Sequence, residues 1–147
     1  MKLPPADVQF HEDVRLLVWR PHGVINEAAV KHIVTLIGDL EASSGNPFNR
    51  FTDTLAAEAI DLNFRFIFHV SLFRRLSYAG RSPVKSAILV TRLTLDHYGK
   101  LHAMLTQGSS IKVRIFEQRE PAAKWLGVPV ERLTVQEYLG HFCCSPF

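Results

Sequence analysis

The chain has 147 residues, of which 47% are hydrophobic and 21% are charged, with a formal net charge of +3. This balance excludes an intrinsically disordered chain, and no apolar run approaches the ~20 residues that cross a bilayer. Residues 1–7 lack the apolar region of a signal peptide. The two cysteines, Cys143 and Cys144, are adjacent, which is a poor geometry for a structural disulfide. We therefore expect one cytoplasmic domain over residues 1–147, with a core at about 8–128 and a helical tail at 129–147.

The first half of the chain predicts a strand pair, a helix and a third strand. Two strands joined by a polar turn are expected over residues 8–20, and Pro21 and Gly23 end them. Asn26 is a candidate helix N-cap, and residues 43–47 end that helix. A short strand follows over residues 50–55. The apolar stripe of the helix comprises Val30, Ile33, Val34, Ile37 and Leu40.

Residues 61–79 support two interpretations. Alternating apolar residues between positions 62 and 72 fit a strand, whereas Phe66, Val70, Phe73 and Leu76 fit a helix. A run of this length is rare as one strand and ordinary as one helix. The sequence therefore favours a helix that begins near Asn63.

The second half predicts two strands and two or three helices. A buried strand is expected over residues 86–91, a helix over 94–108, and a strand with one solvated face over 111–116. Glu120 and Pro121 begin a short helix with proline at its first position, Gly127 closes it, and residues 135–142 add a last helical turn or two. The order predicts an α/β fold, with a mixed, mainly parallel sheet of about five strands and helices packed against it.

Several sequence phrases carry a family resemblance over residues 8–128, and the most specific is the ending Ala-x-x-Trp-Leu-Gly after a strand. They are Asn49-Arg50-Phe51-Thr52-Asp53, Lys85-Ser86-Ala87-Ile88-Leu89-Val90, Tyr98-Gly99, Val113-Arg114-Ile115-Phe116 and Ala122-Ala123-Lys124-Trp125-Leu126-Gly127. With the element order, they resemble the SpoIIAA-like branch of the STAS superfamily, the fold of anti-sigma-factor antagonists. The resemblance implies a regulatory or protein-interaction fold that often forms dimers.

The resemblance also implies a position for a phosphorylation switch. In the founding antagonists, a partner kinase phosphorylates a serine at the start of the helix after the third strand. The matching region here is residues 61–64, where Asp61 and Asn63 stand and no serine is present. This departure places the switch itself in doubt.

Candidate catalytic, metal and redox groups each have a simpler structural explanation. His97 and His102 are five residues apart, so they do not share a helix face, and the other histidines are expected to be solvated or capping. Asp53, Glu58 and Asp61 are expected as surface carboxylates at a strand end and a helix start. Nucleophile motifs and glycine-rich phosphate loops are absent from the sequence. We therefore expect no enzyme activity, no cofactor and no metal, and rank an enzyme that uses Asp53, Asp61 or His97 last.

Two surface features remain. Arg74, Arg75, Arg81 and Lys85 form a basic cluster, which we interpret as a solvated helix end because no strand carries the aromatic pattern of an RNA-recognition sheet. No nucleic-acid partner is therefore expected.

An excess of phenylalanine is the second feature. Phe64, Phe66, Phe68 and Phe73 cannot all face one core from a single helix, so they form an interface or an apolar pocket, or are covered on two sides. The sequence thus predicts a non-catalytic regulatory or protein-interaction module, with a protein partner or a second copy as its partner. The alternative is a carrier of a small apolar or anionic molecule.

Overall fold

A five-stranded sheet forms the centre of the protein. The computed structural model describes residues 7–63, 65–66, 69–70, 83–91 and 111–133. The strand order is β1-β2-β4-β6-β7, with β1 antiparallel to β2 and every other neighbouring pair parallel. This confirms the predicted mixed, mainly parallel sheet. The strands are β1 (Val8–His11), β2 (Leu16–Trp19), β4 (Asn49–Asp53), β6 (Val84–Leu89) and β7 (Ile111–Phe116).

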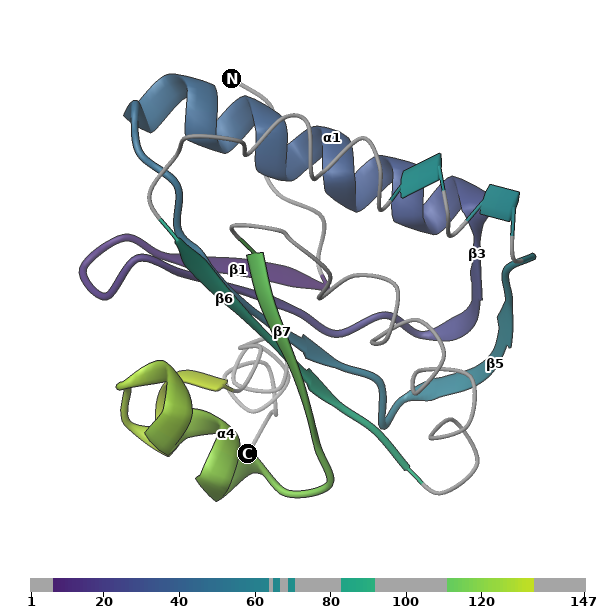
Figure 1. Ribbon diagram of the computed structural model, residues 1–147. Coiled ribbons are helices and arrows are strands. Elements are labelled where there is room, and N and C mark those ends of the chain that lie inside the picture. The colour runs from purple at the N-terminus through teal and green to yellow at the C-terminus, as the bar shows by residue number, and fades with distance from the viewer. Residues whose placement is uncertain (1–6, 64, 67–68, 71–82, 92–110, 134–147) are drawn as a thin grey trace, which may run out of the picture.

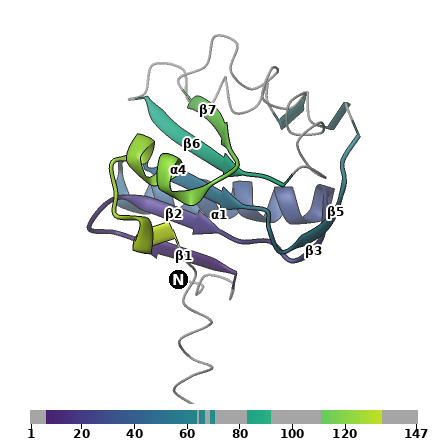
Figure 2. The same ribbon diagram turned by 90° about the horizontal axis from the view of Figure 1, so that it is seen from below.

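Helices cover both faces of this sheet (Figures 1 and 2). Helix α1 (Glu27–Ser44) lies along one face, and α4 (Arg119–Leu126) with a 3-10 helix (Val130–Leu133) lies against the other. The side chains of a strand alternate between faces. Leu16 and Val18 accordingly pack with α4, whereas Leu17 packs with α1.

The ends of α1 and α4 follow from local chemistry. The side chain of Asn26 accepts a hydrogen bond from the Ala29 backbone N–H at 3.0 Å, as expected of an N-cap. Gly45 and Gly127 end the two helices with positive φ angles of 77° and 75°, which glycine adopts without strain. The start of α4 differs from the prediction, because the helix begins at Arg119 and Pro121 is its third residue.

A second, two-stranded parallel sheet was not predicted. It pairs β3 (Gly23–Asn26) with β5 (Ala57–Asp61) beside the main sheet (Figure 1). The sequence of β5 does not indicate a strand, because alanine and glutamate are poor strand formers and all five residues are exposed or half-buried. Asp61 therefore ends a strand.

The segment after β5 is helical where it is described, at residues 65–66 and 69–70. Asn63 accepts a hydrogen bond from the Phe66 backbone N–H at 2.8 Å, which is the contact of an N-cap. This supports the predicted start near Asn63. The rest of that helix, the helix expected over 94–108 and the turns expected over 135–142 lie outside the described residues.

A buried histidine joins the first hairpin to the end of the described chain. The histidines were expected to be solvated or capping, but His11 is 8% exposed and its Nδ1 lies 3.3 Å from Arg132 Nη1. Burial lowers the pKa of the His11 ring, and the charge of Arg132 adds to this effect. Arg132 also donates two hydrogen bonds to Asp13, at 2.7 and 3.0 Å, and holds the pKa of that carboxyl below its usual value.

We predict that His11 makes stability depend on pH. The unfolded chain binds a proton at His11 near its ordinary pKa of 6.5, whereas the folded chain binds it only at lower pH. The free energy of unfolding should therefore fall as the pH drops below about 6.5. The test compares urea unfolding of the wild type and His11→Gln at pH 7.5 and 5.5, with exposed His32→Gln as the control. If the free energy of unfolding of His11→Gln depends on pH as steeply as that of the wild type, the prediction is contradicted.

Candidate functional site

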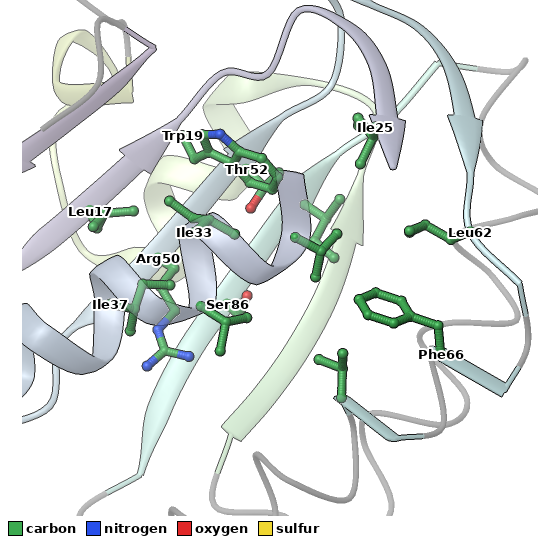
Figure 3. A pocket seen from close by; sticks show the side chains of 14 residues that line it. Leu17, Trp19, Ile25, Ile33, Ile37, Arg50, Thr52, Leu62, Phe66 and Ser86 are labelled. Atoms are coloured by element: carbon green, nitrogen blue, oxygen red, sulfur yellow. The ribbon is translucent and has the colours of Figure 1, made fainter. Parts of the chain in front are cut away.

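An apolar pocket lies between α1 and the central strands of the sheet (Figure 3). Its volume is about 110 Å³. The floor comes from β2, β4 and β6, the roof from α1, and the rim from β3 and the segment after β5. The lining residues are Leu17, Trp19, Ile25, Val30, Ile33, Val34, Ile37, Arg50, Thr52, Leu62, Phe66, Val70, Ser86 and Ile88.

The floor consists of two rows that strand pairing brings into line. The first row joins Leu17, Arg50 and Ser86 across β2, β4 and β6. The second row joins Trp19, Thr52 and Ile88 across the same strands. Each strand contributes two residues that are two positions apart, so all six side chains lie on the face toward α1. Arg50, Thr52 and Ser86 thus bring polar groups to the floor of an otherwise apolar pocket.

The roof is one stripe of α1. Val30, Ile33, Val34 and Ile37 follow the spacing i, i+3, i+4 and i+7, which places them on one side of the helix. Ile33 and Ile37 are buried, at 5% and 9% exposure. The predicted apolar stripe is therefore confirmed, and four of its five members line the pocket.

The rim includes one of the four phenylalanines that the sequence singled out. Leu62 and Phe66 enter the pocket from the segment after β5 (Figure 3). Asn63 Nδ2 donates to Glu27 Oε1 at 3.1 Å, and Lys31 Nζ lies 5.9 Å from the centre of the Phe66 ring. These contacts tie the segment to the first turns of α1. Phe64, Phe68 and Phe73 lie outside the described residues.

A buried ion pair spans α1 and β4 beside the pocket. Arg50 and Glu41 are 3% and 5% exposed, and Arg50 Nη2 lies 3.1 Å from Glu41 Oε2. The Phe48 backbone N–H donates to the same carboxylate oxygen at 3.3 Å. This ion pair was not predicted from the sequence. The alternation along β4 was the feature of the sequence that could have indicated a buried arginine. Arg50 and Thr52 lie on one face of this strand, and Phe51 lies on the opposite face, in the core against α4.

A wider groove adjoins the pocket and lies between α1 and the described residues of the segment after β5. We call it the α1 groove; its volume is about 630 Å³. Phe66, Val34 and Val70 supply its apolar part, and both signs of charge are present around them. The other lining residues are Glu27, Lys31, Thr35, Asn63, Arg65 and His69.

The three carboxylates considered as candidate catalytic groups, Asp53, Glu58 and Asp61, differ in burial. Asp53 was expected on the surface but is 2% exposed. Its Oδ2 accepts from Arg119 Nη2 at 2.6 Å, and its Oδ1 accepts from the Leu55 backbone N–H at 2.9 Å. Asp53 therefore fixes the end of β4 to the start of α4. Glu58 and Asp61 are exposed on β5.

The basic cluster is described only at Lys85. This residue was expected near a helix end, but it lies on β6, where its Nζ donates to the Trp125 carbonyl at 2.8 Å. The Trp125 ring lies 5.4 Å from Lys85 Nζ and 5.8 Å from the Arg114 guanidinium carbon. Lys85 therefore links β6 to Trp125 of α4. Arg74, Arg75, Arg81, His97 and His102 lie outside the described residues.

The described residues contain neither a candidate metal site nor a membrane-spanning helix. Within the ranges described above, no three His, Cys, Asp or Glu side chains gather as a metal site would require. Across those same ranges, no helix is long and apolar enough to cross a membrane.

We predict that the Arg50–Glu41 pair is strongly coupled. Glu41→Ala leaves a buried arginine without this partner and should lower the free energy of unfolding by about 3–5 kcal/mol. A double replacement by leucine removes both charges and should recover most of that loss. Urea unfolding measures each value, with exposed Glu58→Ala on β5 as the control. A loss from Glu41→Ala no larger than that from Glu58→Ala would refute the coupling.

Comparison with known proteins identifies the fold. No model of a protein family matches the chain, and no curated protein matches it. Among solved structures, the chain is similar to an uncharacterised protein of the DUF3478 family with a SpoIIAA-like fold, from Shewanella loihica PV-4. The two chains are 14% identical, with a TM-score of 0.50, over 81% of this chain and 89% of that one. The chain therefore has a SpoIIAA-like fold, as the sequence phrases predicted.

Proposed function

We propose that the chain is a non-catalytic regulatory or protein-interaction module that binds through the α1 groove. The observation that carries this proposal is the composition of the groove, which combines the apolar residues Val34, Phe66 and Val70 with charged residues of both signs. Protein interfaces commonly combine an apolar core with a polar rim. The acidic groups Glu41 and Asp53 support a non-catalytic role, because each is buried in an ion pair that joins elements of the fold.

A second copy of the chain is the partner that suits this groove. In a two-fold symmetric dimer the same surface meets itself, so each acidic residue can face a basic residue of the other copy. Glu27 on one copy and Lys31 or Arg65 on the other supply such pairs. The aromatic residues Phe64, Phe68 and Phe73 belong to this proposal as further interface candidates. Asn63, in the region that matches the family's phosphorylation position, lines the same groove.

The second candidate function is a carrier of a small molecule. It is favoured by the pocket beneath α1, which is lined almost entirely by apolar side chains. The groove and the pocket share Val34, Phe66 and Val70, so a ligand in the pocket would contact the residues that border the groove. The two candidates are therefore compatible.

We predict that changes in the α1 groove disrupt self-association. Phe66→Asp places a charge among the apolar residues of the groove, and Arg65→Glu reverses an exposed charge without altering the core. Each should raise the dimer dissociation constant at least about tenfold. Sedimentation velocity measures this constant, and circular dichroism verifies that each variant is folded.

Leu55→Asp is the matched control, because Leu55 is 40% exposed and precedes β5, whereas Phe66 follows it. This variant should associate as the wild type does. A wild type that stays monomeric, or a dimer that both groove variants leave unchanged, would rule out self-association through this surface.

A further inference from the structure

The floor of the pocket carries hydroxyl groups where a buried parallel sheet usually carries aliphatic residues. Ser86 of β6 is 6% exposed, and Thr52 of β4 lies diagonally from it on the neighbouring strand. Figure 3 shows both on the side of the sheet that faces Ile33 and Ile37. Both residues line the pocket, so their hydroxyl groups can donate to or accept from a polar atom placed there. A polar group that enters an apolar site needs such a partner, so this position suits a ligand with one polar atom.

The volume limits the size of that ligand. The pocket holds about 110 Å³, and an apolar protein cavity of roughly 150 Å³ is known to take up benzene. The pocket is smaller than that cavity, so it limits the ligand to one six-membered ring or an alkyl chain of similar bulk. The side chains around it are mostly aliphatic, with Phe66 and Trp19 as the aromatic members. The body of the ligand is accordingly apolar.

The local charge favours a neutral ligand. Among the lining residues that the structure describes, Arg50 is the one cationic side chain, and its Nη2 lies 3.1 Å from Glu41 Oε2. The pair has no net charge, so an anion in the pocket would lose its hydration without meeting an uncompensated positive charge. A neutral hydroxyl or carbonyl compound avoids this cost.

We infer that the pocket between α1 and the sheet binds a small neutral molecule with one apolar ring or short alkyl body and a single hydroxyl or carbonyl oxygen. The oxygen meets the hydroxyls of Ser86 and Thr52, and the apolar body lies against Ile33, Ile37 and Ile88. This inference rests on the carrier function proposed above and narrows its ligand from apolar or anionic molecules to neutral ones.

Three probes of similar size separate the contributions to binding. Benzyl alcohol carries the ring and the oxygen, toluene carries the ring alone, and benzoate carries the ring with a negative charge. In a methyl-resolved NMR titration, benzyl alcohol should shift the Ile33, Ile37 and Ile88 methyls and leave Leu126 and Leu133, which pack on the opposite face, unmoved. Benzyl alcohol should bind more tightly than toluene, and toluene more tightly than benzoate.

Two serine variants test the role of the oxygen. Ser86→Ala should raise the dissociation constant of benzyl alcohol roughly fivefold, because one hydrogen bond is lost, and should leave that of toluene unchanged. Ser43→Ala, on the exposed side of α1, should change neither. Equal effects of the two variants would overturn the assignment of Ser86. Tighter binding of benzoate than of benzyl alcohol would overturn the preference for a neutral ligand, and no shift at Ile33 with any probe would overturn the site.

These outcomes are separate from those of the self-association test. Ser86 is buried in the sheet and Arg65 is exposed in the groove, so each variant probes one surface only. A dimer that binds no probe would refute the ligand site and leave the interaction module intact. A monomer that binds benzyl alcohol would refute self-association through the groove and leave the ligand site intact.

Discussion

The buried pair between Glu41 and Arg50 sets how α1 meets the sheet. Glu41 stands in the last turns of α1, and its carboxylate receives both the Arg50 guanidinium and the Phe48 backbone N–H. The end of the helix, the loop after it and the start of β4 are thereby held together. Burying two charges costs several kcal/mol, and the contacts of Glu41 with Arg50 and with the Phe48 backbone offset part of that cost. Because Arg50 shares its row with Leu17 and Ser86, its long side chain occupies the sheet beneath α1 and keeps aliphatic packing from being continuous there.

The two faces of the sheet consequently differ in character. On the face toward α4, Ala87, Ala122 and Ala123 are at most 3% exposed, and their small side chains allow the helix to approach the strands closely. That face is fixed further by the Asp53–Arg119 pair and by the contacts of Lys85 with Trp125. The face toward α1 carries Arg50, Thr52 and Ser86, and there the pocket lies. The sheet is thus closely packed against α4 on one face, whereas a pocket remains beside the core on the face toward α1.

Local patterns predicted much of this architecture. The first hairpin, the Asn26 cap, the stripe of α1 and the glycine after α4 each depend on residues close in sequence, where spacing and capping chemistry act directly. β5 escaped prediction because Ala57, Glu58 and Ala59 carry neither β propensity nor a buried face. Its partner β3 has only four residues. Its first residue, Gly23, indicates a turn and its last, Asn26, indicates a helix cap, so the sequence did not indicate a strand there.

The candidate site was harder to predict, because it depends on strand register. Alternation shows that Arg50 and Thr52 share a face, but only the pairing of β2, β4 and β6 brings them beside Leu17 and Ser86. Asp53 was misassigned to the surface for a related reason, since its partner Arg119 is 66 residues away in the sequence. The aromatic excess drew attention to Phe66, which lines the pocket, but gave no sign of the pocket floor.

A crystal structure determined under xenon pressure would test the pocket most directly, since xenon occupies apolar cavities of this size without requiring a hydrogen bond. Xenon is expected between α1 and the sheet, bordered by Ile33, Ile37 and Ile88. A structure in which side chains fill that space, with no xenon between α1 and the sheet, would contradict the existence of a binding pocket on this face.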